Sequence, residues 1–142
     1  MSGVAVHQDA AVIEHGRIAL REMKELCSSL VYGTILTDDG FEVVRLAPAA
    51  AADGRFASMA SSIQALSDAV ARELNIGASE YVVIASELGH VVQRRVPGHP
   101  LVLAALFDTD ETLGKALSIS RLAAVKLAAH LGSPESPSAT HN

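Results

Sequence analysis

The chain has 142 residues, of which 49% are hydrophobic and 19% are charged, and its formal net charge is -5. These values indicate one compact soluble domain, because two full domains would be cramped at this length. Few aromatic residues and an acidic balance argue against nucleic-acid binding, which needs stacking platforms or a positive field. A single cysteine, Cys27, excludes an internal disulfide and a four-thiolate zinc site and fits a reducing compartment.

The first predicted element is an amphipathic helix within residues 11–30, where apolar residues recur at helical steps. Residues 1–10 are expected to form an N-terminal tail without a secretion signal, because polar residues interrupt every apolar run there. No uncharged stretch approaches the length of a membrane span. We therefore expect a cytoplasmic protein that does not insert into membranes.

A hairpin and a second helix follow. Residues 31–37 and 41–46 are rich in β-branched side chains, and Asp39–Gly40 predicts a two-residue turn with positive φ at both positions. The alanines at 49–52 form a connection or an early start of the next helix. That helix is the clearest in the chain, because residues 56–74 carry a wide apolar stripe before the stop signals Asn75 and Gly77.

Residues 81–86, 90–96 and 101–107 predict three strands joined by short turns, which makes an antiparallel meander. The first and last of these strands are almost entirely apolar. Such composition indicates burial on both faces and therefore helices on both sides of the sheet.

The last predicted helix runs to Leu131, and Thr109 or Asp110 is expected to cap its start. Residues 132–142 lack large apolar side chains and predict a disordered C-terminal tail. The fold class is therefore α+β. It comprises one domain of residues 11–131, with a five-stranded antiparallel sheet, helices on both faces and the element order αββαβββα.

Candidate metal ligands and nucleophiles are few. His90 and His99 could meet across a strand hairpin, but a zinc site would need further ligands, so exposed hairpin residues are the favoured interpretation. Cys27 lies on an apolar helix stripe, where a buried hydrophobic role is favoured over a nucleophile. Gly54 stands alone and makes no phosphate loop. We predict no metal site and no cofactor site.

Two charged groups have ordinary and functional interpretations. Strand alternation sends Arg94 and Arg95 to opposite faces, so a solvated strand end is favoured over an arginine supplied in trans to a nucleotide hydrolase. The acids fall in two sets, for which turn formation and helix capping are favoured over general acid/base work. These sets are Asp38 with Asp39, and Asp108, Asp110 and Glu111. We predict no catalytic residues and no enzyme.

Several segments in order resemble the roadblock/dynein light chain family, whose fold is roadblock/profilin-like. The resemblance covers about residues 26–131. Its segments are the strand–turn–strand opening at 31–41, Met59–Ser62, Tyr81–Ile84 and Asp108–Gly114. The chain departs from the family with Thr112 where asparagine is common and with a longer alanine-rich connection.

The resemblance implies a homodimer in which the second helices pack together and the third strands pair edge to edge. The sequence has its own reason for this, since an apolar helix face and an open apolar edge strand both need cover. The alternative is a monomer in which both are core elements. The implied interface residues are Met59, Ile63, Leu66, Val70, Tyr81, Val83 and Ala85.

The resemblance also implies a non-enzymatic regulator or scaffold. Our first hypothesis is a protein that binds a small Ras-like GTPase and modulates its nucleotide cycle. The second is a structural adaptor for a kinase or motor complex, which differs only in partner. A third is a small-molecule sensor with a pocket lined by Tyr32, Phe41 and Phe107, although the aromatic residues are few.

Overall fold

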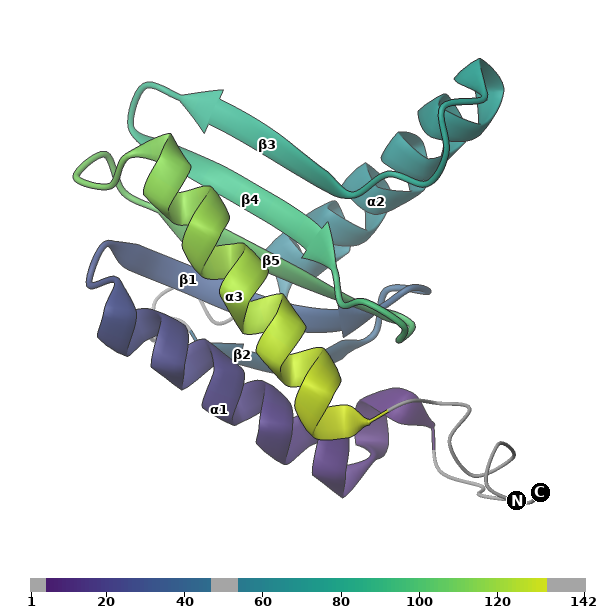
Figure 1. Ribbon diagram of the computed structural model, residues 1–142, viewed down its shortest axis with the longest axis horizontal. Coiled ribbons are helices and arrows are strands. Elements are labelled where there is room, and N and C mark those ends of the chain that lie inside the picture. The colour runs from purple at the N-terminus through teal and green to yellow at the C-terminus, as the bar shows by residue number, and fades with distance from the viewer. Residues whose placement is uncertain (1–4, 47–53, 133–142) are drawn as a thin grey trace.

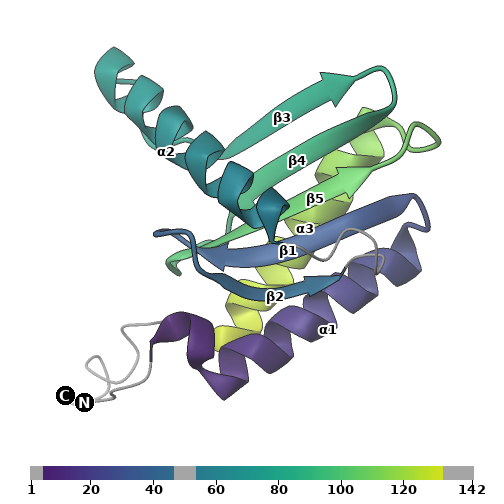
Figure 2. The same ribbon diagram turned by 180° about the vertical axis from the view of Figure 1, so that it is seen from behind.

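The computed structural model describes residues 5–46 and 54–132. The elements in chain order are η1 (Val6–Gln8), α1 (Ala10–Leu26), β1 (Leu30–Thr37), β2 (Glu42–Leu46), α2 (Arg55–Leu74), β3 (Tyr81–Ser86), β4 (Gly89–Arg95), β5 (Leu101–Phe107) and α3 (Leu113–Leu131). The strands form one antiparallel sheet in the order β2-β1-β5-β4-β3. Helices α1 and α3 lie on one face and α2 on the other (Figures 1 and 2). The predicted α+β class and element order are confirmed.

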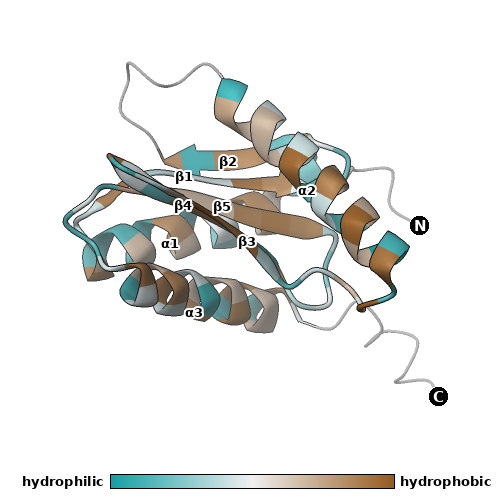
Figure 3. Ribbon diagram, turned by 90° about the horizontal axis from the view of Figure 1, so that it is seen from above, coloured by the Kyte–Doolittle hydropathy of each residue, from teal (hydrophilic) through white to brown (hydrophobic). Residues whose placement is uncertain are grey.

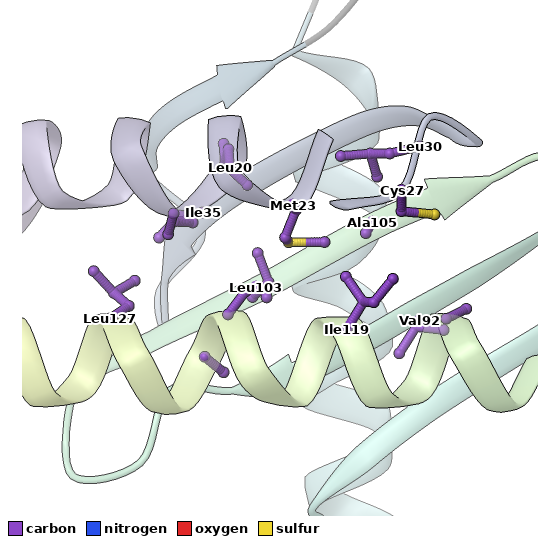
Figure 4. Close-up of a cluster of buried hydrophobic side chains, with 14 of the residues drawn as sticks. Leu20, Met23, Cys27, Leu30, Ile35, Val92, Leu103, Ala105, Ile119 and Leu127 are labelled. Atoms are coloured by element: carbon purple, nitrogen blue, oxygen red, sulfur yellow. The ribbon is translucent and has the colours of Figure 1, made fainter. Parts of the chain in front are cut away.

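The larger core lies between the sheet and the pair α1 and α3 (Figure 4). Leu20 and Met23 of α1 meet Ile119 and Leu127 of α3 there, above the buried face of β5. Helix α1 approaches the sheet closely at Gly16, where an added Cβ would lie 3.0 Å from Val44 Cγ1. The small residue thus sets the distance between α1 and the strands beneath it.

A smaller core lies under α2 and contains Leu36, Ala60, Val102 and Ala104. A polar contact accompanies it, because the Gln93 Nε2 amide donates to Ala60 O at 2.8 Å and to Gln64 Oε1 at 3.0 Å. Both glutamine side chains are buried. Small side chains, Phe56 and a buried amide network therefore attach the N-terminal half of α2 to the sheet, and its C-terminal half projects past the sheet (Figure 1).

The N-terminal boundary differs from the predicted one. The folded part begins before residue 11, because η1 lies within the predicted tail and α1 starts at Ala10. The Asp9 side chain accepts hydrogen bonds from Ala11 N and Val12 N, which caps the helix. Residues 1–4 of that tail lie outside the described part, as do the predicted C-terminal tail from residue 133 and the alanine-rich connection at 49–52.

Helix α1 also ends earlier than predicted. Cys27 is its C-cap, and Leu30 already belongs to β1. The apolar spacing of Cys27 and Leu30 continues the helical period, yet both side chains are buried in the larger core from non-helical positions. The predicted burial of Cys27 and Leu30 is correct, whereas the prediction that both are helical is wrong.

The predicted two-residue turn between β1 and β2 is also wrong. The strands are joined by residues 38–41, and positive φ occurs at Gly40 (97°) but not at Asp39. The Thr37 hydroxyl accepts a hydrogen bond from Phe41 N at 3.0 Å and donates to the Asp39 carboxylate. This side-chain bonding stabilises a longer turn that needs only one left-handed residue.

The cap of α3 is Thr112, not Thr109 or Asp110 as predicted. Its hydroxyl accepts from Lys115 N at 3.2 Å, whereas Asp108 accepts from Asp110 N within the preceding turn. Thr112 is the position at which the chain departs from the resembled family. Threonine serves there as an N-cap in the ordinary way.

Candidate self-association surface

Helix α2 carries its large apolar side chains away from the sheet. The buried residues of α2 are Ala57, Ala60, Gln64 and Ala71, so small side chains dominate its buried face. The outward stripe runs at three- and four-residue spacing through Met59 (51% exposed), Ile63, Leu66 (67%), Val70 and Leu74. Figure 3 shows hydrophobic segments along this helix where it leaves the sheet. A contiguous exposed apolar stripe of this length is typical of an interaction surface.

Strand β3 forms one edge of the sheet and pairs only with β4. Its residues are exposed or partly exposed throughout, so the predicted burial of both its faces is wrong, whereas β5 is buried as predicted. An open apolar edge offers unpaired backbone groups to another strand. The position of β3 at the edge satisfies the condition on which the predicted strand pairing depends.

The α2 stripe and the β3 edge are adjacent. The Ser67 and Ser79 hydroxyls are hydrogen-bonded, which ties the middle of α2 to the segment that enters β3. A hollow of about 310 Å³ lies at this junction and is lined by Val70, Ile76 and Tyr81 among others. We therefore treat the stripe and the edge as one surface, named the α2–β3 surface.

Arginine side chains hold the neighbouring end of the sheet. Arg95 forms ion pairs with Asp38 of the β1–β2 turn at 2.8 Å and with Asp68 of α2. Arg94 points to the other face, where its Nε and Nη2 atoms lie 3.3 Å from Ser120 Oγ and Leu117 O of α3. The predicted opposite placement of these two residues is confirmed. Because Arg95 already has two carboxylate partners, it is not poised to act in trans on a nucleotide.

Solved structures share this architecture at low sequence identity. An MglB with a tetrameric arrangement aligns with a TM-score of 0.73 at 21% identity, covering 86% of this chain and 91% of that chain. The gliding protein MglB from Thermus thermophilus aligns with a TM-score of 0.74 at 20% identity, covering 86% of this chain and 92% of that chain. A Roadblock/LC7 domain from Streptomyces avermitilis aligns with a TM-score of 0.70 at 13% identity, covering 78% of this chain and 92% of that chain. The chain has the roadblock fold. No family model and no curated protein matches the sequence.

Within the roadblock fold, the predicted interface residues fall on two faces. Met59, Ile63, Leu66 and Val70 lie on the α2 stripe. Of the β3 residues, Tyr81 lies beneath the Arg94 guanidinium at 4.9 Å from its ring centroid, and Val83 packs against the larger core. Alternation places Ala85 with them, on the α3 side of the sheet.

The apolar residues of β3 that share the α2 side are Val82 and Ile84, which the predicted interface set does not include. Ile84 is 41% exposed beside the apolar stripe. Strand alternation alone separates the two sets, but β3 is apolar on both faces, so composition gives no sign of which set faces α2. The contacts of Tyr81 with Arg94 and of Val83 with the larger core show that these two residues face α3.

Most of the candidate catalytic and metal residues are dispersed, but the buried Cys27 thiol donates to Glu111 Oε1 at 2.7 Å. His90 is the second residue of β4 and His99 follows the other end of that strand, so the two do not meet. No group of three or more potential metal ligands occurs in residues 5–46 and 54–132. The acids of the β1–β2 turn lie at the opposite end of β1 from those that follow β5, because Leu30 pairs with Phe107 and Thr37 with Leu101. Within the described ranges, no helix is long and apolar enough to cross a membrane.

The aromatic residues of the sensor hypothesis are separated as well. Tyr32 packs edge-on against Phe56 of α2 at 4.7 Å between ring centroids, whereas Phe107 is buried in the larger core on the other face. Phe41 is half exposed and stacks on His7. The three rings therefore line no common pocket.

Proposed function

We propose that this chain is a cytoplasmic, homodimeric and non-enzymatic regulator or scaffold that binds a small Ras-like GTPase and modulates its nucleotide cycle. The observation that carries the proposal is the α2–β3 surface, which exposes large apolar side chains beside an unpaired strand edge. A second copy related by a two-fold axis offers the same stripe and the same edge, so each meets its like. Pairing of two β3 edges would continue the sheet across both protomers.

Three further points support the proposal. One structure with the same fold is an MglB in a tetrameric arrangement, which is an assembly of several chains. The GTPase partner rests on the resemblance to the roadblock/dynein light chain family. Cys27 and Glu111 are candidate catalytic groups that do meet, but both side chains are buried, which supports a role that works by binding.

Light scattering after size-exclusion chromatography tests the first half of the proposal. A dimer is expected across the accessible concentration range, and a monomer at all concentrations would refute the homodimer. Hydrolysis assays with Ras-like GTPases from the same genome test the second half. A complex with altered GTP turnover is expected, whereas a complex with unchanged turnover would favour the adaptor hypothesis.

A further inference from the structure

A groove on the opposite side of the sheet from α2 lies between α3 and the segment that enters β3. It encloses about 320 Å³, and its lining includes Arg94, Arg95, Arg121, Glu80 and Val125. In Figure 1, α3 crosses the near face of the sheet while β3 extends along its outer edge. The parts of the groove contributed by Arg94 and by α3 therefore lie apart from the apolar α2 stripe on the far face, whereas Ser79 and Glu80 also line the hollow at the α2–β3 junction.

The charge of the groove runs against that of the whole chain. Three arginines and one carboxylate line it, although the protein carries a formal net charge of -5. Arg95 is neutralised by Asp38 and Asp68. Within the described residues, Arg94 and Arg121 have no carboxylate at ion-pair distance, so two positive charges there lack an acidic partner.

Arg94 is held in place rather than free to swing into solvent. Its guanidinium bonds to Ser120 Oγ and Leu117 O and lies over the Tyr81 ring. Burial lowers the pKa of Arg94, and the charge of Arg121 acts in the same direction against the opposing effects of Tyr81 and Glu80. A partly desolvated cation of this kind gains from an anion more than an exposed one does.

The neighbouring walls define what kind of anion fits. Guanidinium groups bind carboxylates in a planar, two-point geometry. Pro97 and Val125 add apolar surface beside the charges. We propose that this groove binds an acidic peptide segment of a partner protein, with a carboxylate between Arg94 and Arg121 and a neighbouring aliphatic side chain against Val125 and Pro97. A doubly charged phosphate fits less well, because Glu80 lies in the same lining.

The test measures fluorescence anisotropy of a labelled Glu-Leu-Glu-Glu-Leu-Glu peptide at about 0.15 M salt. Saturable binding is expected, with little binding of the Gln-Leu-Gln-Gln-Leu-Gln peptide. Arg121→Glu is expected to weaken binding of the acidic peptide by about tenfold or more. Arg21→Glu is the matched control, since it makes the same charge change at an exposed position of α1, and it is expected to leave binding unchanged.

A second variant guards against a simple loss of folding. Arg94→Lys keeps the charge but removes the two-point geometry. It is expected to weaken binding of the peptide while the circular dichroism spectrum remains that of the native protein. Equal binding of both peptides, or equal effects of Arg121→Glu and Arg21→Glu, would overturn the proposal. Direct binding of inorganic phosphate or of anionic vesicles, without binding of the peptide, would overturn the peptide proposal and assign the groove to a phosphate group.

Self-association is measured in parallel. Arg121→Glu is expected to leave the molar mass in solution unchanged, because Arg121 belongs to α3, which lies on the other face of the sheet from the α2 stripe. If the variant instead loses both dimer and peptide binding, the groove belongs to the contact between copies and the peptide proposal fails. If the wild type is monomeric yet binds the peptide, the homodimer fails and the groove proposal stands.

Discussion

The thiol of Cys27 lies 2.7 Å from Glu111 Oε1, although the two residues are 84 positions apart in the chain. Cys27 caps the end of α1, and Glu111 belongs to the turn before α3. Both side chains are buried, and the backbone bond from Asp108 N to Ser29 O joins the same two turns. The contact fastens the two helices of one layer at their shared end.

This contact predicts a loss of stability at alkaline pH. Burial, followed by the hydrogen bond to Glu111, raises the pKa of Cys27 above its ordinary value of 9.0. The protonated thiol thus stabilises the fold fully below pH 9.0, and that contribution is lost as pH rises through the folded-state pKa. Urea unfolding at several pH values checks it. Cys27→Ser keeps a donor without the titration, so the decline from Cys27 should be absent in that variant.

Replacement of Leu66 by glutamate tests the α2–β3 surface. Leu66 is 67% exposed, so Leu66→Glu should leave the fold intact while placing a charge in the apolar contact. We expect the dimer to weaken by about two orders of magnitude. Leu26→Glu changes an equally apolar exposed residue at the end of α1 and should leave the molar mass unchanged. Equal behaviour of the two variants would argue against the surface.

The buried amide pair predicts non-additive effects. Gln93→Leu removes the donor to Gln64 Oε1 and Ala60 O and should destabilise the fold by about 1–3 kcal/mol. Adding Gln64→Leu removes the unpaired partner, so the double variant should be less destabilised than the sum of the single variants. Denaturant midpoints of the four proteins measure the coupling. Strict additivity would show that the contact contributes little.

We expect replacement of Gly40 by alanine to destabilise the fold for two reasons. Its φ is 97°, and an added Cβ would lie 2.9 Å from Ser61 Oγ of α2. Gly54 also has positive φ, but nothing lies within 4 Å of its added Cβ. Gly54→Ala should cost about 1–2 kcal/mol from backbone strain alone, and Gly40→Ala should cost more. Thermal unfolding compares them, and equal losses would show that the Ser61 contact relaxes freely.

Much of the fold is predictable from sequence because turns punctuate it. Gly89 and Pro97–Gly98 bracket the last strands, whose structural bounds match the predicted ones within one residue. The end of α1 was missed because Cys27 and Leu30 satisfy helical spacing and strand burial alike. The exposure of β3 was not predicted, because an apolar run has the same composition in a strand buried on both faces and in an exposed edge strand.

The candidate surface was found in part for similar reasons. The α2 stripe follows helical spacing, so Met59, Leu66 and Val70 are identifiable without a structure. Which β3 residues share a face with them depends on contacts between distant segments, and the predicted interface set does not include Ile84. The basic groove is harder still, since Arg94 and Arg121 are 27 positions apart and only the packing of α3 on the sheet brings them together.

The larger core takes none of its fully buried side chains from residues 55–86, the segment that holds α2 and β3. The segment that carries the proposed α2–β3 surface is thus largely separate from the larger core. Substitutions within that one continuous segment can change which copies pair while the α1–α3 layer stays intact. Related chains in one cell could in this way diverge into distinct pairs without each having to evolve a new core.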